Sequence, residues 1–426
     1  MSPEAQASSS LRRTLSTGQA VTIGVGSMVG AGVFVVWSPA AALTGTPGLL
    51  LLSLLLVTVV AACNAYSSAI LGVRFPNAGG TYVYGTRCLG PLPGFLAGWC
   101  FVVGKTASCA AMALTLGLYV SPGDPRVAAA GAVLVLGVAN ALGAQRSASL
   151  SRVLVTLTLS VLAGLALSAL WMAVAGRTGS PMTPAEAIGP GGAYGVLQAA
   201  GLLFFAFAGY ARIATLAEEV RDPERTLPQA ITVTFVVVAG VYAAVALLVL
   251  GTIGIEGAAA TQTPLAAVAD DVWDGEFGWV VQAAALCAAT GALLNMLLGV
   301  SRVLLAMARD GHLPQPVARV SGPRRLPWVA EAAVTVTVLV VVLSVDVRGA
   351  IGFSSFGVLL YYAVTNLSAW TVRAGAWWQS AAPAIGLIGC LVLVAALPLT
   401  SVFGGALVVT LGIGWYAVTR RSRMAG

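Results

Sequence analysis

Two glycine-containing segments inside long apolar stretches are suited to bind a small polar molecule. The first, Gly24 to Phe34, holds four glycines, and the second, Phe204 to Ile213, is centred near Gly209. Glycine costs about 1 kcal/mol in a helix interior, so both segments predict an interrupted helix. Backbone groups freed by such a break cannot be satisfied by lipid and persist only where they line a cavity. Half-helix N-termini suit a carboxylate and half-helix C-termini suit an ammonium group, so the two breaks together would fit a zwitterion.

A purely structural interpretation of these glycines is also open. Gly26 and Gly30 are four residues apart, which is the spacing that lets two membrane helices pack closely. Four glycines matched by a second break exceed what close packing requires, so we favour a binding site.

Lys105 is the second candidate for chemistry, because it is the one lysine of the chain and lies near the middle of the third apolar stretch. A lysine at that depth costs roughly 3 kcal/mol unless it faces a cavity or a partner. No Asp or Glu lies in the core of an apolar stretch, so the ammonium group is expected near backbone carbonyls, or as the neutral amine that burial favours. Lys105 is therefore predicted to exchange a proton or to bind an anionic group, with snorkelling to the interface as the structural alternative.

Arg212 follows Gly209 by three residues and is always charged, so it needs carbonyls, water or an anion nearby. It would either neutralise a substrate carboxylate or reach Glu218 or Glu219, about two helical turns further on. We favour the second arrangement, an inner gate.

The composition predicts the elements that position these residues. Hydrophobic residues make up 58% of the 426 positions and charged residues 9%, a balance typical of a polytopic membrane protein whose partner is the lipid bilayer. Twelve apolar runs are predicted to span it. They are Gln19–Leu43, Pro47–Leu71, Leu92–Val120, Val127–Gly143, Leu150–Val174, Ala193–Leu216, Pro228–Ile253, Phe277–Met307, Trp328–Val345, Ala350–Trp370, Pro383–Leu397 and Val402–Val418.

The distribution of charge sets the expected orientation. With the N-terminus inside, only Arg126, Arg177 and Arg348 among the arginines of the connecting segments fall outside, which follows the positive-inside rule. The segment 254–276 is acidic and lacks basic residues. Met1 to Ser10 lacks the pattern of a cleaved signal peptide. We therefore expect a multi-pass protein of the plasma (inner) membrane with both termini cytoplasmic.

The same counts exclude several classes of function. His312 is the one histidine, so a multi-histidine metal site is excluded, and neither a metal nor another cofactor is expected. The six cysteines lack paired spacing and are predicted to be small core residues. The net charge of +7 is scattered over the connecting segments, which indicates topology rather than nucleic-acid binding. An enzyme would need clustered acids and a channel would need rings of like residues, and the sequence shows neither pattern.

Five segments occur in a fixed order between Gly24 and Gly311. They are Gly30-Ala-Gly-Val-Phe34, Phe75-Pro-Asn-Ala-Gly-Gly-Thr-Tyr-Val-Tyr84, Phe204-Phe-Ala-Phe-Ala-Gly-Tyr210, Glu218-Glu-Val-Arg-Asp-Pro-Glu-Arg-Thr-Leu-Pro228 and the stretch from Ser301-Arg302 through Arg309-Asp-Gly311. The set resembles the amino acid–polyamine–organocation (APC) superfamily of permeases. The segments match its first and sixth spans, the loops after its second and sixth spans, and the end of its eighth span.

The resemblance implies an all-α integral membrane protein with twelve transmembrane helices and a LeuT-type fold, a 5+5 inverted repeat with broken helices 1 and 6. The expected divisions are a cytoplasmic tail (1–18), the first repeat (19–175), the second repeat (176–373) and two accessory spans with a basic tail (374–426). Main-chain atoms around Val29, Gly30, Ala31 and Gly32, and near Phe205, Ala206, Phe207 and Gly209, would hold the substrate. Phe207 and Tyr210 would act as aromatic gates or lids, with core or lipid-facing packing as the alternative.

The chain departs from the family at one position. In several proton-coupled members, a lysine in the fifth span takes the place of the sodium ion of sodium-coupled relatives, and Thr158 aligns with about that position here. Lys105 would do the equivalent job or would point into the substrate cavity. Thr158 and Thr290 could supply hydroxyl oxygens to a cation, but Lys105 nearby would repel it, so sodium dependence is disfavoured.

The function expected from the sequence is secondary active transport of amino acids. Proton-coupled symport of neutral amino acids by alternating access is the favoured form, since a cationic substrate would want a carboxylate that the predicted site lacks. Amino acid exchange, export, and transport of a related amine or organic acid remain open alternatives.

Overall fold

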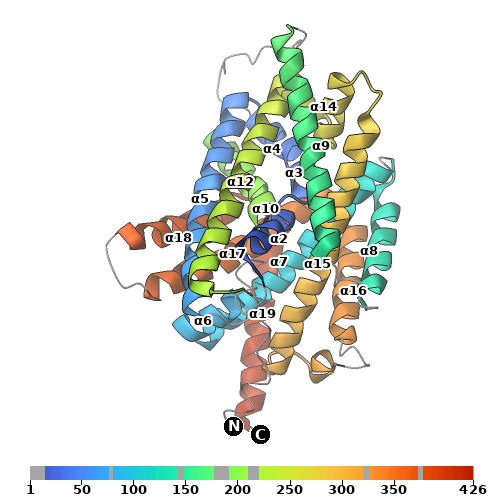
Figure 1. The fold of residues 1–426 in the computed structure, drawn as a ribbon. Coiled ribbons are helices and arrows are strands. Elements are labelled where there is room, and N and C mark those ends of the chain that lie inside the picture. The colour runs from blue at the N-terminus through green and yellow to red at the C-terminus, as the bar shows by residue number, and fades with distance from the viewer. Residues whose placement is uncertain are drawn as a thin grey trace.

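The computed structural model describes residues 15–75, 80–121, 123–141, 148–176, 191–209, 220–320, 327–372 and 378–425. Over these residues the chain forms a bundle of helices (Figure 1), and the β-structure in them is a single isolated bridge between Leu15 and Val220.

Nine helices in the described part of the chain are long and apolar enough to cross a membrane. They are α2 (Thr17–Met28) continued by α3 (Gly32–Val35), α5 (Pro47–Arg74), α7 (Pro91–Val120), α9 (Ala148–Val174), α12 (Pro223–Thr252), α15 (Gly278–Arg309), α17 (Val347–Val372), α18 (Trp378–Ala396) and α19 (Leu399–Ala425). Three shorter apolar helices, α8 (Pro125–Ala141), α10 (Gly192–Phe207) and α16 (Trp328–Ser344), lie where the fourth, sixth and ninth spans were expected. The chain is therefore an all-helical, multi-pass membrane protein, and the total of twelve crossing helices stays a prediction.

Shorter helices complete the described part of the fold. They are α4 (Trp37–Thr44), α6 (Thr81–Leu89), α13 (Gly254–Ala260), α14 (Pro264–Val272) and the 3-10 helix η2 (Gln315–Ala318). In Figure 1, α6 and the C-terminal end of α19 lie at the lower end of the bundle, and α14 lies near the opposite end. Of the acidic residues of the segment 254–276, Glu256 lies on α13 and Asp270 and Asp271 lie on α14, whereas Asp274 and Glu276 lie in the turn between α14 and α15.

The long helix α7 lies at the centre of the bundle. In its most apolar window 78% of the residues are buried, against 11% for α19. Gly104 on α7 faces Gly357 on α17, where an added Cβ atom at Gly104 would lie 3.1 Å from the Gly357 Cα atom. This close backbone approach makes α7 a fixed element, and it carries Lys105.

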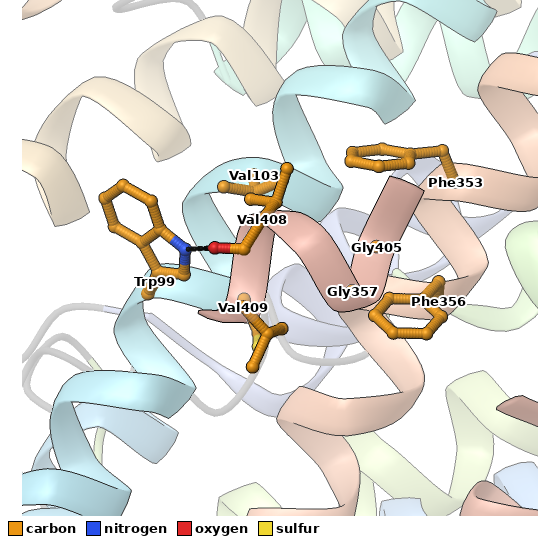
Figure 2. Close-up of a pocket in the computed structure, with 9 residues that line it drawn as sticks. Trp99, Val103, Phe353, Phe356, Gly357, Gly405, Val408 and Val409 are labelled. Carbon is orange, nitrogen blue, oxygen red and sulfur yellow. Dashed lines mark hydrogen bonds between the residues drawn. The ribbon is translucent and has the colours of Figure 1, made fainter. Parts of the chain in front are cut away.

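The last two helices attach to this centre through specific contacts. In the pocket drawn in Figure 2, the indole Nε1 of Trp99 donates a hydrogen bond of 2.9 Å to the carbonyl oxygen of Val408 on α19. Helix α18 joins α5 and α17 at a buried polar cluster, where Asn366 donates to the Oδ1 atom of Asn64 at 2.6 Å and the Cys390 Sγ atom of α18 donates to the same oxygen at 3.4 Å. The pocket of Figure 2 has an almost wholly apolar lining, so it is not suited to bind a zwitterion.

Candidate functional site

The first predicted break is present in the structure. Helix α2 ends at Met28, the chain leaves helical geometry at Val29 (ψ 67°), and α3 begins at Gly32. The N–H group of Gly30 donates to the Met28 carbonyl oxygen at 2.8 Å in a tight turn. The glycines of this segment therefore interrupt a helix, as the sequence predicts.

The second break follows α10. This helix ends at Phe207, and the Gly209 N–H donates to the Phe207 carbonyl oxygen at 2.8 Å, again in a tight turn. Tyr210, Arg212, Glu218 and Glu219, predicted as gate residues, lie outside the described residues.

Glycines allow the two breaks to touch. An added Cβ atom at Gly32 would lie 2.9 Å from the Ala206 Cα atom, and one at Gly209 would collide with the carbonyl oxygen of Ser27. Gly30 approaches Ala292 on α15 in the same way, with 2.9 Å from an added Cβ atom to the Ala292 Cβ atom. Interruption and close packing, the two interpretations of these glycines, thus occur together.

A small cavity, which we call the central cavity, lies where the two breaks meet α7. Its lining comes from the first break, the second break, α7 and α15. The lining residues are Ser27, Met28, Gly30, Ala31, Gly32, Phe205, Ala206, Ala208, Gly209, Lys105, Ser108, Met112 and Met296. The structure thus brings most of the predicted substrate-binding residues and Lys105 together.

Lys105 is the formally charged residue of this lining. Its side chain is 4% exposed, and its Nζ atom donates a hydrogen bond of 2.8 Å to the carbonyl oxygen of Ala208. Ala208 directly follows the last residue of α10, where carbonyl groups lack helical partners and the helix dipole is negative. The ammonium group therefore caps the half-helix that ends at the second break.

Tyr242 on α12 is a site residue that the sequence reasoning missed. Its hydroxyl group lies 2.7 Å from the Met28 carbonyl oxygen and 2.8 Å from the Ala206 carbonyl oxygen. A phenol has one proton, so it donates to one carbonyl at a time and links the two broken helices. A lone hydroxyl in the middle of an apolar stretch was the available signal in the sequence.

The sequence of this chain is similar to those of known proteins. The sequence profile of the amino acid permease family matches residues 15–418. This chain belongs to the amino acid permease family. It is a member of the APC superfamily and a transporter of amino acids, not an enzyme.

The permease has relatives along most of its length. It is 49% identical over 421 residues to an uncharacterized transporter of Mycobacterium tuberculosis, covering 97% of this chain and 93% of the relative. It is 29% identical to the vacuolar cationic amino acid transporter 2 of Arabidopsis thaliana, covering 85% of this chain and 60% of the relative. It is also 27% identical to the branched-chain amino acid permease BcaP of Bacillus subtilis, covering 75% and 72%, respectively.

The aromatic residues of α10 divide between the cavity and the core of the permease. Phe205 lines the central cavity. Phe207, predicted as a gate, is fully buried away from that lining, and its ring meets the Tyr242 ring edge-on at 4.8 Å. Phe205 thus faces the central cavity, and Phe207 makes a packing contact.

A second small cavity, which we call the side cavity, lies on the other flank of the first break. Its lining comes from α2, α9 and α15. The lining residues are Gly26, Val29, Leu154, Val155, Thr158, Cys287, Ala288, Gly291, Ala292 and Asn295. Val29 and Thr158 therefore lie here rather than at the central cavity. Thr290 is half-buried on α15 and is not part of this lining, so the two threonines do not line one cavity.

The side cavity holds no formally charged residue in its lining. The Thr158 hydroxyl donates to the Leu154 carbonyl oxygen at 2.9 Å, and the Asn295 amide donates to the Gly291 carbonyl oxygen at 2.9 Å. Lys105 lines the central cavity and not this one. Of the two places considered for Lys105, the geometry favours the substrate cavity.

A backbone contact joins the segments before α2 and before α12. Leu15 pairs with Val220 in a bridge, and the Arg221 N–H donates to the Leu15 carbonyl oxygen at 3.0 Å. This contact ties the start of the first broken span to the segment that leads into α12, at the position expected for an inner gate.

Proposed function

We propose that this permease is a secondary active transporter that moves neutral amino acids together with protons across the plasma membrane by alternating access. The observation that carries the proposal is the hydrogen bond of 2.8 Å between the Lys105 ammonium group and the Ala208 carbonyl oxygen, in a cavity whose described lining residues include no acidic one.

The proton coupling rests on the position of Lys105. A lysine that is 4% exposed loses much of the hydration that stabilises its charge, so it can change between ammonium and amine during a cycle. As an ammonium group, Lys105 donates a charge-assisted hydrogen bond to the carbonyl oxygen at the end of α10. As a neutral amine it makes a weaker hydrogen bond there. Protonation of one side chain would thus change the contact between α7 and the second break.

The substrate class rests on the lining of the central cavity. Phe205, Met112 and Met296 offer apolar and polarizable surface, and Ser108 offers a hydroxyl group. A cationic side chain would need an anionic partner and would face the ammonium group of Lys105 instead. The relatives include a cationic amino acid transporter and a branched-chain amino acid permease, and this lining supports a neutral aliphatic substrate.

The remaining parts of the proposal concern architecture. The two interrupted helices, α2–α3 and α10, would belong to two inverted repeats over residues 19–175 and 176–373, with both termini cytoplasmic. The contact between Leu15 and Val220 would then close the cytoplasmic side. Exchange and export use the same elements and are the alternatives that the experiment separates.

Uptake by purified protein in proteoliposomes tests the proposal. A panel of labelled amino acids, amines and organic acids is offered with an imposed pH gradient and then with a sodium gradient. We expect accumulation of a neutral amino acid driven by the pH gradient. Uptake that requires sodium, or uptake in which lysine, arginine or putrescine competes best, would contradict it. Uptake that needs an internal amino acid instead of a gradient would identify an exchanger.

A further inference from the structure

We propose that the ammonium group of Lys105 stands in for the α-amino group of a substrate, so that the central cavity also binds and transports aliphatic carboxylates that lack an α-amino group. This inference rests on the proposed function, because it concerns the same cavity. It extends the substrate class from amino acids to their deaminated counterparts, the 2-oxo acids and simple monocarboxylates.

The first step is the position of the ammonium group. The C-terminal end of a half-helix carries partial negative charge and is the place where a zwitterion would put its amino group. At the end of α10 the Ala208 carbonyl oxygen already accepts a hydrogen bond of 2.8 Å from the Nζ atom of Lys105. The protein therefore supplies its own ammonium group, tethered to α7, where the ligand would otherwise supply one.

The second step is the state of the neighbouring carbonyl groups. Tyr242 reaches the carbonyl oxygens of Met28 and Ala206 at 2.7 and 2.8 Å. In some sites the helix-end carbonyl groups have no donor from the protein and pair only with the ammonium group of the ligand. A deaminated ligand then leaves a buried acceptor unpaired, so such a site binds it much more weakly. The Met28 carbonyl oxygen also accepts a hydrogen bond from the Gly30 N–H group. The one proton of Tyr242 is therefore available to the Ala206 carbonyl oxygen. Lys105 donates to Ala208, so a ligand without an amino group leaves none of these carbonyl groups unpaired.

The third step is the capacity left on Lys105. An ammonium group has three N–H donors. Among the described residues, one of these donors forms a hydrogen bond, to the Ala208 carbonyl oxygen. Because none of the described residues that line the cavity is acidic, a ligand carboxylate is the natural counter-ion. A cationic side chain on the ligand, as in lysine, would share the same small space with the Lys105 ammonium group and be repelled.

The apolar part of the lining sets the rest of the ligand. Phe205, Met112 and Met296 surround the cavity, and methionine adapts to aliphatic shapes of different branching. The ligand class is therefore a carboxylate with a short aliphatic tail, with or without an α-amino group.

The experiment compares three matched ligands of one skeleton with the wild-type protein. They are the best neutral amino acid of the uptake panel, its 2-oxo acid and its amide, which keeps the ammonium group and loses the carboxylate. Inhibition of uptake in proteoliposomes and thermal stabilisation of the purified protein are both measured. We expect the 2-oxo acid to compete within tenfold of the amino acid, and the amide to be at least tenfold weaker than either.

The variant Lys105→Met separates this role from a structural one. We expect binding of the 2-oxo acid to fall at least tenfold and binding of the amino acid to change less than threefold, because the amino acid brings its own ammonium group to Ala208. Gly240→Ala, at an exposed position of α12 where an added Cβ atom meets nothing within 4 Å, is the control for folding and reconstitution.

Three outcomes would overturn the inference. They are a wild-type protein that takes the amino acid but binds its 2-oxo acid a hundredfold more weakly, a Lys105→Met variant that loses both ligands equally, and an amide that competes as well as the amino acid. Should the variant fail to fold, the wild-type comparison still decides. A wild-type protein that neither binds nor transports any amino acid would instead refute the proposed function itself.

Discussion

The two cavities beside the first break differ in one respect that matters for transport. The central cavity contains a buried ammonium group, that of Lys105, hydrogen-bonded to the end of α10. The side cavity is lined by Thr158, Asn295 and apolar residues, without formal charge. Gly26 and Val29 line the side cavity, whereas their neighbours Ser27, Met28 and Gly30 line the central cavity. The first break thus separates a charged cavity from one whose lining carries no formal charge among the described residues.

This difference indicates where the driving ion acts. A sodium site needs several oxygen ligands, and Thr158 and Asn295 are the two side chains of the described side-cavity lining that carry an oxygen atom. The titratable group instead shares a cavity with the expected substrate. Coupling in this permease would therefore work through direct electrostatic contact between Lys105 and the substrate, rather than through a separate ion site.

Removing the charge tests the comparison most severely. We expect Lys105→Met to reduce gradient-driven accumulation at least about fiftyfold, because the central cavity then has no group that gains and loses a proton. Exchange between compartments of equal pH should fall much less. The measurement is labelled amino acid uptake into proteoliposomes with and without a pH gradient, and wild-type accumulation by the variant would remove the coupling role.

Filling the contact between the two breaks is expected to have the next largest effect. An added methyl group at Gly209 would collide with the Ser27 carbonyl oxygen, and such overpacking costs about 1–3 kcal/mol. We expect Gly209→Ala to lower the transport rate about tenfold. The control Gly240→Ala should stay within about twofold, since its added methyl group meets open space. Equal rates for the two variants would show that the breaks do not need to touch.

Removing one hydroxyl group should have a smaller effect. Tyr242→Phe keeps the edge-on ring contact with Phe207 but leaves a helix-end carbonyl without its donor, which costs about 1 kcal/mol or about fivefold in rate. Tyr194→Phe, at an exposed position of α10, is the matched control. Initial rates of uptake measured over a range of substrate concentrations check this. A Tyr242→Phe variant as active as the control would show that the link between the breaks is dispensable.

The side cavity is expected to be the least sensitive place. Thr158→Val keeps the shape of the side chain and removes a hydroxyl group that donates to the Leu154 carbonyl oxygen, so we expect less than about twofold change in proton-driven uptake. A large loss, or a sodium requirement that disappears in the variant, would move the coupling site to this cavity.

The sequence predicted the breaks because their cause is local. Four glycines in one apolar stretch oppose a continuous helix whatever surrounds them, and the interruption at Gly30 is where that argument put it. The depth of Lys105 was predictable for the same reason. Its partner Ala208 was not, because the two residues are 103 positions apart in the chain and meet only in the tertiary fold.

The face of each helix was harder to predict than its place. Phe205 and Phe207 are two residues apart, which puts them on nearly opposite sides of a helix, so a choice between them depends on how α10 is rotated. Tyr242 poses the same problem, since its hydroxyl group could have pointed to any neighbour of α12. Such orientations come from tertiary contacts that a single sequence does not contain.

Counting protons per substrate tests the central claim most directly. A pH-sensitive dye trapped inside proteoliposomes reports proton entry while a labelled neutral amino acid is taken up, in parallel for the wild type and for Lys105→Met. We predict about one proton per amino acid for the wild type, from the single titratable amine of the central cavity, and no coupled proton entry for the variant. Equal proton movement in the two proteins, or uptake driven by sodium without proton entry, would contradict the account.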